Sequence, residues 1–300
     1  MEVNNLFDVK GKVVLVTGGA RGIGRMITEG FVANGAKVYV ASRDAAACEA
    51  AAAELSARGP GSCVAIPADL LRLSECERLA SELRAREARL HVLVNNSGAA
   101  WGAPLSDFPD AQWSRVLTLN LQRAFTLTQL LLPLLEAAGD ESGDGKDGGG
   151  TGDNPAAVIN IGSINGLSVP NLENYSYSAS KAGLHHLTRH LSQVLGPKGI
   201  TVNSLVRTPV LSHSPFQLFT IMTLLTLSPL LKACGPFDTK MMAFSMKHFR
   251  DAIEDGNPMR RHGRPGDVAG ACIFLASRAG SYVNGATINV DGGVHLAAKM

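Results

Sequence analysis

The amino-acid sequence predicts an α/β fold in which a single doubly wound parallel sheet carries helices on both faces. Two observations lead to this prediction. Short, continuous apolar runs such as residues 12–17 (KVVLVT) and 37–41 (KVYVA) are typical of strands buried on both faces, as parallel strands are. Segments with helical apolar spacing separate these runs, and strictly alternating strands and helices require right-handed crossovers between parallel strands.

The expected elements alternate along the whole chain, so we predict one domain over residues 1–300. Strands are expected at residues 12–17, 37–41, 63–69, 91–96, 156–163, 200–205 and 286–290. Helices are expected at residues 23–34, 44–58, 73–87, 111–138 and 177–195, and after Pro265. Gly35 and the Gly59-Pro60 pair should end the first two helices, because glycine suits a helix C-cap and proline cannot continue a helix.

The composition argues against several classes of partner. Of the 300 residues, 45% are apolar and 18% are charged, the profile of a globular protein with a large core. The net charge of +2 is too small to indicate binding to nucleic acid or to an anionic membrane. Aromatic residues, at 5%, offer little for stacking on bases.

The cysteines and histidines indicate neither a metal site nor a redox pair. No two cysteines form a CxxC motif, and His185 and His186 are adjacent, so they cannot share a helical face as ligands. The cysteines are Cys48, Cys63, Cys76, Cys234 and Cys272. Reduced thiols and an N-terminus unlike a secretory or transit signal predict a cytoplasmic protein.

Two segments break the alternating pattern. Residues 139–154 contain seven glycines in sixteen positions and almost nothing apolar, so we expect a disordered surface loop there. Residues 206–232 are rich in Leu, Thr and Pro and lack charge between Arg207 and Lys232. Prolines interrupt this run well short of the ~20 residues that a spanning helix needs, so we expect no membrane span.

A glycine-rich turn follows the first predicted strand and opens the first helix. Gly18, Gly22 and Gly24 stand in a G-x-x-x-G-x-G spacing around Arg21 and Ile23. Glycines at a strand–turn–helix junction let backbone N–H groups approach a pyrophosphate at the helix N-terminus. Many glycine trios are ordinary turns, but this context favours a dinucleotide-binding site.

The end of the second predicted strand bears on which dinucleotide binds. An acidic residue there would accept a hydrogen bond from the ribose 2′-hydroxyl of NAD. This chain has Ser42 and Arg43 instead, with Asp44 one place later, and Arg21 lies in the glycine turn. Because arginine pairs with phosphate oxygens in a charge-assisted fork, we expect NADPH or NADP. The alternative is that both arginines are solvated surface residues.

Tyr177 and Lys181 stand four residues apart in a predicted helix, so they share one face. A phenol is a weak acid at neutral pH, and a neighbouring ammonium favours its ionised form. Such a tyrosine can hand a proton to a carbonyl oxygen as hydride reaches the carbon. The pattern alone is common on helix surfaces. Tyr175 is a second tyrosine nearby, but it lacks a lysine at the fourth position.

Taken together, these motifs resemble the short-chain dehydrogenase/reductase family over nearly the whole chain apart from the two odd segments. TGGARGIG at residues 17–24 and NNSG at 95–98 match that family. Asn120, Ser163 and the Tyr177/Lys181 pair follow in the family's order. The resemblance implies a Rossmann fold and reduction of a carbonyl group with NADPH.

The resemblance also implies roles for individual residues. Tyr177 would donate the proton, Lys181 would hold the nicotinamide ribose and assist Tyr177, and Ser163 would hydrogen-bond the substrate carbonyl. Asn120 would hold a water molecule that links Lys181 to solvent. Singly, Ser163 could merely cap a helix and Asn120 could merely face the core. The implied cofactor-binding residues are Gly18, Arg21, Gly22, Ile23, Gly24, Ser42, Arg43, Asp69, Leu70, Asn95, Ser97, Gly98, Tyr177, Lys181 and Thr239.

The same resemblance marks residues 206–232 as an insertion. In the family, the strand matching residues 200–205 leads into a Pro-Gly turn and a threonine that meets the nicotinamide carboxamide. In this chain the family's sequence pattern continues only at Ala233 and reaches Thr239. Without the 27 residues in between, the sequence would be ITVNSLACGPFDTKMM. We favour a retained intron or gene-model error over a genuine apolar lid across the substrate entrance. A segment that is truly made would displace Thr239 and impair activity.

Several stretches resemble the 3-oxoacyl-[acyl-carrier-protein] reductase branch of the family, and its rhamnolipid-type members most. They are NNSGAAWG, INIGSINGLS, GPFDTKM and RRHGRPGDVAG. The implied reaction reduces a 3-oxoacyl thioester, on acyl carrier protein or coenzyme A, to the 3-hydroxy form. A reductase of sugars, polyols or polyketide-like ketones is the nearest alternative, because a fold does not fix a substrate. A non-catalytic nucleotide-binding protein is the alternative of another class. The family further implies a homodimer or homotetramer.

Overall fold

The computed structural model describes residues 2–139, 154–170, 172–206, 254–255 and 257–296. Seven strands form one sheet in the order β3-β2-β1-β4-β5-β6-β7, and every neighbouring pair is parallel. The strands are β1 (Val13–Thr17), β2 (Lys37–Ala41), β3 (Ser62–Ala65), β4 (Val92–Asn95), β5 (Ala156–Ile161), β6 (Ile200–Val206) and β7 (Thr287–Asn289). The chain winds outward from β1 in both directions, which confirms the predicted doubly wound parallel sheet.

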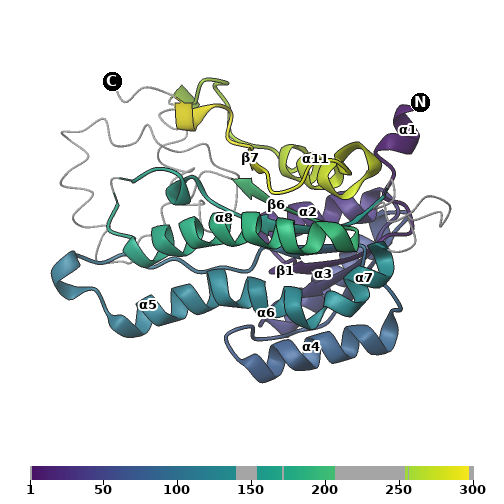
Figure 1. Ribbon diagram of the computed structural model, residues 1–300, viewed down its shortest axis with the longest axis horizontal. Helices are drawn as coiled ribbons and strands as arrows, with labels where there is room; N and C mark the ends of the chain where they lie inside the picture. Colours follow the sequence, from purple (N-terminus) through teal and green to yellow (C-terminus); the bar gives the residue numbers. More distant parts are fainter. Residues whose placement is uncertain (1, 140–153, 171, 207–253, 256, 297–300) are drawn as a thin grey trace.

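Helices cover both faces of this sheet (Figure 1). On one face lie α4 (Leu73–Arg86), α6 (Arg123–Leu130), α7 (Leu132–Gly139) and α8 (Tyr175–Leu195). On the other lie α2 (Gly22–Ala33), α3 (Ala45–Arg58) and α11 (Pro265–Ala276). The short helix α1 (Val3–Leu6) precedes β1, and α5 (Asp110–Leu117) leads into α6. These helices begin and end within a few residues of the predicted ones, with one exception described below.

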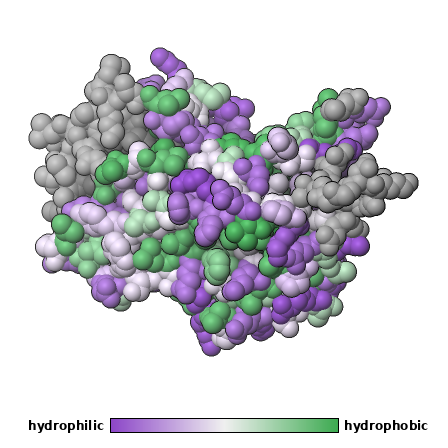
Figure 2. All heavy atoms as spheres, in the orientation of Figure 1, coloured by the Kyte–Doolittle hydropathy of each residue, from purple (hydrophilic) through white to green (hydrophobic). Residues whose placement is uncertain are grey.

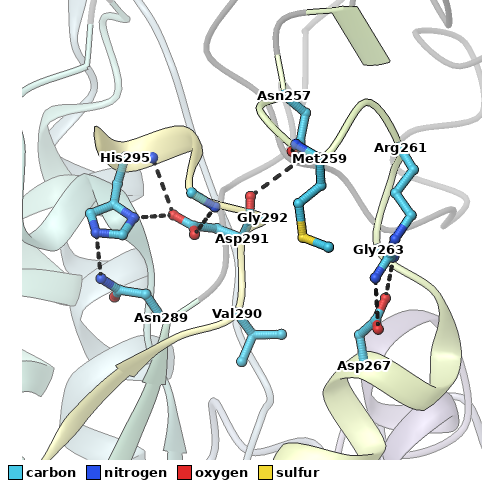
Figure 3. A pocket seen from close by; sticks show the side chains of 11 residues that line it. Asn257, Met259, Arg261, Gly263, Asp267, Asn289, Val290, Asp291, Gly292 and His295 are labelled. Carbon is cyan, nitrogen blue, oxygen red and sulfur yellow. Dashed lines mark hydrogen bonds and ion pairs between the residues drawn. The ribbon is translucent and has the colours of Figure 1, made fainter. Parts of the chain in front are cut away.

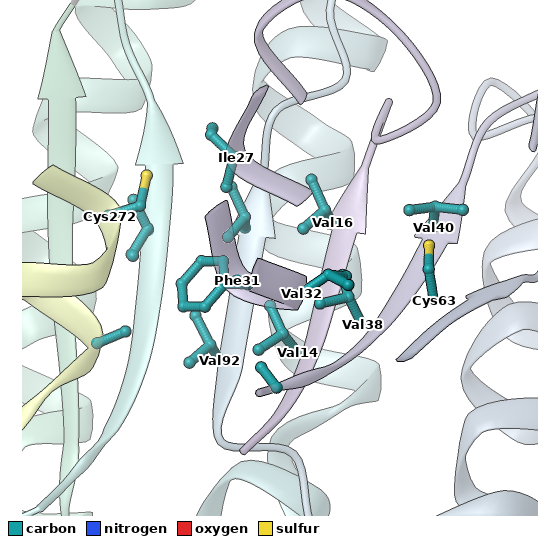
Figure 4. Close-up of a cluster of buried hydrophobic side chains, with 14 of the residues drawn as sticks. Val14, Val16, Ile27, Phe31, Val32, Val38, Val40, Cys63, Val92 and Cys272 are labelled. Atoms are coloured by element: carbon teal, nitrogen blue, oxygen red, sulfur yellow. The ribbon is translucent and has the colours of Figure 1, made fainter. Parts of the chain in front are cut away.

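Alternation along the strands divides the core into two layers. All five residues of β1 are buried, yet successive side chains point to opposite faces of the sheet. Val14 and Val16 therefore join a cluster with Phe31 of α2, which Figure 4 shows on one face. Leu15 joins the opposite cluster with Leu83 of α4. This two-sided burial explains why the strands appear in the sequence as continuous apolar runs.

The predicted long helix over residues 111–138 is interrupted in the structure. Residues Thr118–Gln122 form a π-helical turn between α5 and α6, and Leu131 separates α6 from α7. Pro133 lies in the first turn of α7, where its missing N–H costs no helical hydrogen bond. Such π turns are frequent at functional sites, and this one contains the buried Asn120.

The structure describes the edges of the two segments that break the sequence pattern. Gly139 is the buried last residue of α7, and Asn154 accepts a hydrogen bond from Lys12 Nζ at 2.6 Å, so both belong to the packed body. Val206 is fully buried and extends β6, where it pairs with Asn289 of β7. Residues 139 and 154 were therefore wrongly included in the predicted disordered loop, whereas the insertion predicted at residues 206–232 stays a prediction. The rest of both segments, residues 140–153 and 207–232, lies outside the described residues.

A buried lysine ties the amino end of β1 to the end of α11. Lys12 Nζ donates to the carbonyl oxygen of Ala276, the last residue of α11, at 2.6 Å, and Lys12 is 6% exposed. Burial disfavours the charged ammonium and lowers the pKa of Lys12 to about 8. The nearby Asp8 carboxylate opposes this shift without cancelling it.

Lys12 should make the stability of the protein rise with pH in the alkaline range. Between about pH 8 and pH 10.5 the unfolded chain still binds the proton that folded Lys12 has lost, so unfolding becomes less favourable. Relative to Lys12→Met, the wild-type free energy of unfolding should rise by up to ~3 kcal/mol over this interval. Urea unfolding of both proteins across that range measures the difference. A constant difference would show that Lys12 keeps its proton when buried.

The surface mixes hydrophilic and hydrophobic residues over the face drawn in Figure 2. Among the exposed large apolar side chains, Trp113 lies on α5, Phe125 on α6 and Val194 on α8. No helix within the described residues combines the length and the apolar composition needed to cross a membrane.

Candidate active site

The glycine turn joins the carboxyl end of β1 to the first turn of α2. Gly18 and Gly22 have positive φ angles of 66° and 55°, a region that side chains other than glycine rarely adopt. A Cβ on Gly24 would overlap the carbonyl oxygen of Gly18. Because only glycine fits these positions, the turn stays tight and the N-terminus of α2 opens toward the space above the sheet.

The end of β4 is fastened to the end of β1 beside this turn. Asn96 Nδ2 donates to the carbonyl oxygen of Thr17 at 2.8 Å. The backbone N–H groups of Asn96 and Ser97 both donate to Thr17 Oγ1 at 2.9 Å. These bonds set the spacing between the two strand ends, which form the walls of a cleft.

A cleft of about 700 Å³ lies along the carboxyl ends of β1, β2 and β4. The predicted cofactor-binding residues that line it are Gly18, Arg21, Gly22, Ile23, Gly24, Ser42, Arg43, Asp69, Leu70, Ser97 and Gly98. Residues from four separate parts of the sequence therefore meet at one site. The volume, and a lining that runs from the glycine turn to the ends of β2 and β4, suit a ligand with two nucleotide halves.

The charges at the β2 end of the cleft leave little negative potential. Asp44 Oδ2 pairs with Arg21 Nη2 at 3.2 Å, and Asp44 Oδ1 accepts the Ala47 N–H at 3.0 Å as the N-cap of α3. Arg43 is exposed beside it, and Ser42 Oγ lies 3.1 Å from Cys48 Sγ. With the Asp44 carboxylate occupied in this way, the exposed Arg43 is available to an anionic group at this end of the cleft.

Of the fifteen predicted cofactor residues, Asn95, Tyr177 and Lys181 do not line the cleft, and Tyr177 and Lys181 are described below. Asn95 is buried, and its Nδ2 donates to Asn160 Oδ1 at 2.9 Å, while Asn160 Nδ2 donates to Thr188 Oγ1 of α8 at 2.9 Å. Asn95 therefore links β4 to β5 and α8, and its neighbour Asn96 lines the cleft instead. Thr239 lies outside the described residues.

Sequence reasoning missed a stripe of residues from the α5–α6 segment. Arg115 and Leu119 line the cleft, and the buried Arg123 donates to the carbonyl oxygens of Leu70 and Leu71 at 2.8 and 3.0 Å. These three residues are spaced four apart, so helical periodicity could have grouped them. Arg123 holds the loop that brings Leu70 into the cleft.

The tyrosine and lysine of α8 lie buried beside the sheet. Tyr177 is 5% exposed and Lys181 is 4% exposed. Lys181 Nζ donates to the carbonyl oxygen of Ile161, at the end of β5, at 2.7 Å, and lies 5.8 Å from the centre of the Tyr177 ring. A Cβ on Gly98 would lie 3.9 Å from Lys181 Nζ, so Lys181 approaches the cleft at Gly98.

Asn120 uses its side chain to fix the loop after β4. Its Oδ1 accepts the Ala99 N–H at 2.8 Å, and its Nδ2 donates to the Ala99 carbonyl at 2.9 Å and to Ser180 Oγ at 3.0 Å. The carboxamide is therefore engaged on both sides. Asn120 and Lys181 both lie next to Gly98, because a Cβ on Gly98 would lie 3.1 Å from Asn120 Oδ1 and 3.9 Å from Lys181 Nζ.

Ser163 lies fully buried just beyond the end of β5. Its Oγ accepts the N–H of Asn165 at 3.2 Å and caps a short 3-10 helix, η4 (Ile164–Gly166), while its hydroxyl proton remains able to bind another acceptor. His185 Nε2 lies 3.0 Å from the Ser163 carbonyl oxygen. Burial lowers the pKa of His185, so this imidazole stays neutral at physiological pH.

A second cavity of about 440 Å³ lies beyond the carboxyl end of β7 (Figure 3). Arg261 forms a forked ion pair with Asp267 at 2.6 and 3.1 Å on one side of it. His295 Nδ1 lies 2.6 Å from Asp291 Oδ2 on the other side. None of the predicted site residues in the described part of the chain lines this cavity, and Asn289 Nδ2 lies 3.0 Å from His295 Nε2 in its wall.

Comparison with known proteins agrees with this geometry. A family model described as short chain dehydrogenase matches residues 12–215, and one described as enoyl-(acyl carrier protein) reductase matches residues 233–295. The rhamnolipids biosynthesis 3-oxoacyl-[acyl-carrier-protein] reductase of Pseudomonas aeruginosa is 39% identical, over 97% of this chain and 98% of that protein. The galactitol 2-dehydrogenase (L-tagatose-forming) of Cereibacter sphaeroides is 32% identical, over 98% of both chains.

A solved structure shows the same likeness in three dimensions. The Pseudomonas aeruginosa RhlG/NADP active-site complex superposes with a TM-score of 0.80 at 37% identity, and the match covers 98% of this chain and 100% of that one. Fold and sequence similarity agree over almost the full length. The chain belongs to the short-chain dehydrogenase/reductase family of oxidoreductases.

Proposed function

We propose that this protein is an NADPH-dependent carbonyl reductase that converts a 3-oxoacyl thioester to the 3-hydroxyacyl form. The observation that carries this proposal is the burial of Tyr177 and Lys181 on one face of α8, where Lys181 lies 5.8 Å from the Tyr177 ring centre and approaches Gly98 of the glycine-lined cleft. The 39%-identical relative that bears the name of a 3-oxoacyl-[acyl-carrier-protein] reductase supports the substrate class.

The cleft fits NADPH in shape and charge. The tight turn at Gly18 and Gly24 leaves backbone N–H groups at the N-terminus of α2 for the pyrophosphate, and Arg21 and Arg43 suit the 2′-phosphate. Bound there, NADPH would supply the hydride. The similar RhlG structure, described as an NADP complex, supports this choice of cofactor.

The residues around the cleft then have separate tasks in the reduction. The Ser163 hydroxyl donates a hydrogen bond to the substrate carbonyl oxygen and orients it. The Tyr177 hydroxyl gives its proton to that oxygen as the carbonyl carbon gains the hydride, which yields the alcohol. The Lys181 ammonium lies beside Tyr177 and stabilises the phenolate that remains. The Asn120 carboxamide is engaged by Ala99 and Ser180. The water molecule that links Lys181 to solvent would therefore bind the main chain of the π turn instead of this side chain.

A substrate panel tests the proposed reaction. Acetoacetyl and longer 3-oxoacyl thioesters, ketose sugars and polyols are each supplied with NADPH or NADP, and the absorbance of NADPH is followed. Higher kcat/KM for the thioesters supports the proposal. Higher values for sugars or polyols would favour the second candidate, which the 32% identity to a galactitol dehydrogenase supports. An absence of turnover with every compound would contradict both.

Replacing Arg43 should weaken the preference for NADPH over NADH. A charge-assisted bond to the 2′-phosphate is worth about 1.5–3 kcal/mol, so Arg43→Ala should raise the Kd for NADPH roughly tenfold to hundredfold. The Kd for NADH should change little. Arg58→Ala is a suitable control, because Arg58 pairs with Glu54 and Glu29 and does not line the cleft. Equal losses for both cofactors would place the 2′-phosphate elsewhere.

We further propose that residues 206–232 are absent from the working enzyme. The two family models leave residues 216–232 unmatched, which supports an insertion there. Because Val206 completes β6, Ala233 would take its place in the strand after removal of the segment. Sequencing of the cDNA across codons 200–240 should show a transcript that lacks 27 codons. An abundant transcript that retains them would contradict the intron hypothesis.

The proposed enzyme assembles as a homodimer or homotetramer in the cytoplasm. The apolar side chains of Trp113, Phe125 and Val194 on α5, α6 and α8 support an interface on this side of the molecule. An acyl carrier protein is the expected macromolecular partner. Light scattering coupled to size exclusion measures the oligomer, and a purely monomeric protein would contradict this part of the proposal.

A further inference from the structure

One buried ionisable side chain next to the proposed machinery has no task in the reaction. His185 follows Lys181 by four residues and Tyr177 by eight on α8, so the three share the face that packs on the sheet. His185 is 2% exposed. Its ring lies between the main chain of Ser163, 3.0 Å from Nε2, and Ser204 Oγ of β6, 2.9 Å from Nδ1.

These two partners determine which ring nitrogen carries the proton. A carbonyl oxygen only accepts, so Nε2 of His185 carries the proton and donates it to the Ser163 carbonyl. In the neutral ring Nδ1 then accepts from the hydroxyl of Ser204. Ser204 is itself fixed, because its backbone N–H donates to the Ala286 carbonyl at 2.8 Å. The ring thus connects the loop after β5 to a rigid strand.

Two glycines make room for the ring in that loop. A Cβ on Gly162 would overlap ring carbon Cε1 of His185 and lie 2.7 Å from Ser204 Oγ. A Cβ on Gly166 would lie 2.7 Å from ring carbon Cδ2. Gly162 directly precedes Ser163, and Gly166 ends the 3-10 helix that Ser163 caps. The loop that carries Ser163 therefore packs around the imidazole on both sides.

We propose that His185 is a positioning residue that holds the Ser163 main chain and so directs the Ser163 hydroxyl at the substrate carbonyl. The inference rests on the proposed role of Ser163. The neutral ring supplies the Nε2–H donor without placing a second cation beside Lys181. The direction of the Ser163 hydroxyl is set by the same loop, because Ser163 Oγ accepts the N–H of Asn165 in η4.

Paired substitutions separate positioning from simple packing. His185→Leu places an apolar side chain of similar size there and removes the donor, and kcat should fall about 10–100-fold, because a misplacement of 1 Å can cost about 10²-fold. His185→Gln can place its amide N–H near the Nε2 position and should recover most of kcat. The Kd for NADPH should stay unchanged in both variants. His186→Leu, on the exposed side of α8, should behave as wild type.

A double-mutant cycle with Ser163→Ala tests whether His185 acts through Ser163. Once the hydroxyl is removed, His185→Leu should lower kcat by less than twofold, because two residues that act as one unit are not additive. If the two losses multiply, or if Gln fails as Leu does while both variants stay folded by circular dichroism, the proposal is overturned.

A measurement without turnover keeps this inference separate from the proposed function. Long-range ¹H–¹⁵N spectra of the imidazoles should show His185 as a neutral ring with the proton on Nε2 at pH 7, lost in His185→Gln. An Nδ1–H tautomer, which leaves Nε2 without a proton, would overturn the proposed bond to Ser163. If the protein reduces no carbonyl compound, the proposed function fails, while this spectrum still decides whether the ring holds Ser163.

Discussion

Replacing Tyr177 by phenylalanine is expected to lower kcat/KM for carbonyl reduction by about 10²–10⁴-fold, the range that a general acid contributes. The substitution removes the hydroxyl and leaves the ring, which is 5% exposed and keeps its packing on α8. The Kd for NADPH should stay within about twofold, because Tyr177 does not line the cleft. Initial rates from NADPH absorbance and a fluorescence titration of NADPH measure the two quantities.

Tyr175→Phe is the matched control. Tyr175 is the first residue of α8, its ring contacts Phe108 at a centroid distance of 5.6 Å, and the residue four places later is Ala179. The same atom is removed two residues away, without a lysine beside it, so turnover should match wild type. Equal losses in both variants would indicate a disturbed α8, and wild-type turnover in Tyr177→Phe would refute the assignment of the acid.

The strands and their parallel order could be predicted because burial on both faces leaves a direct mark in the sequence. β2 lies where the run KVYVA predicted it, and the boundaries of α3 follow from Asp44 as N-cap and Gly59 as C-cap. The glycine turn was also predictable, because positive φ angles at Gly18 and Gly22 restrict those positions to glycine. These are local requirements that each segment imposes on its own residues.

The interruption of the long predicted helix could not be read from the sequence. The π turn at Thr118–Gln122 accompanies bonds from Asn120 to Ala99 and Ser180, which come from other parts of the chain. The apolar spacing of the α5–α6 segment continues through the turn, so its pattern gives no sign of the break. Tertiary contacts, and not helix propensity, decide this feature.

The prediction that Asn95 lines the cleft, where the structure has Asn96, was wrong for a similar reason. Adjacent residues at a strand end point in opposite directions, and the motif NNSG does not say which asparagine faces the cleft. Pairing with β5 decides it, because Asn160 lies opposite Asn95 and takes its side chain. His185 was likewise considered only as a metal ligand, since its partners Ser163 and Ser204 are distant in sequence.

Gly24→Ala is expected to raise the Kd for NADPH by about 10²-fold or more. The added Cβ would overlap the Gly18 carbonyl oxygen and lie 2.5 Å from Asn96 Nδ2, so the turn must open. Backbone shifts there would weaken two or more charge-assisted bonds to the pyrophosphate, each worth about 1.5–3 kcal/mol. Fluorescence titration of NADPH measures the loss, and thermal unfolding reports whether the protein stays folded.

Gly266→Ala makes the same change at the start of another helix. Gly266 is the second residue of α11, and a Cβ there meets no atom within 4 Å, so NADPH binding should be unaffected. Stability should be unchanged or higher, by up to ~1 kcal/mol, because alanine favours a helix over glycine. If Gly24→Ala bound NADPH as tightly as this control, the turn after β1 would not be the pyrophosphate site. The positive φ angle at Gly18 would then serve only the tight connection from β1 to α2, which needs a glycine whether or not an anion binds at the N-terminus of that helix.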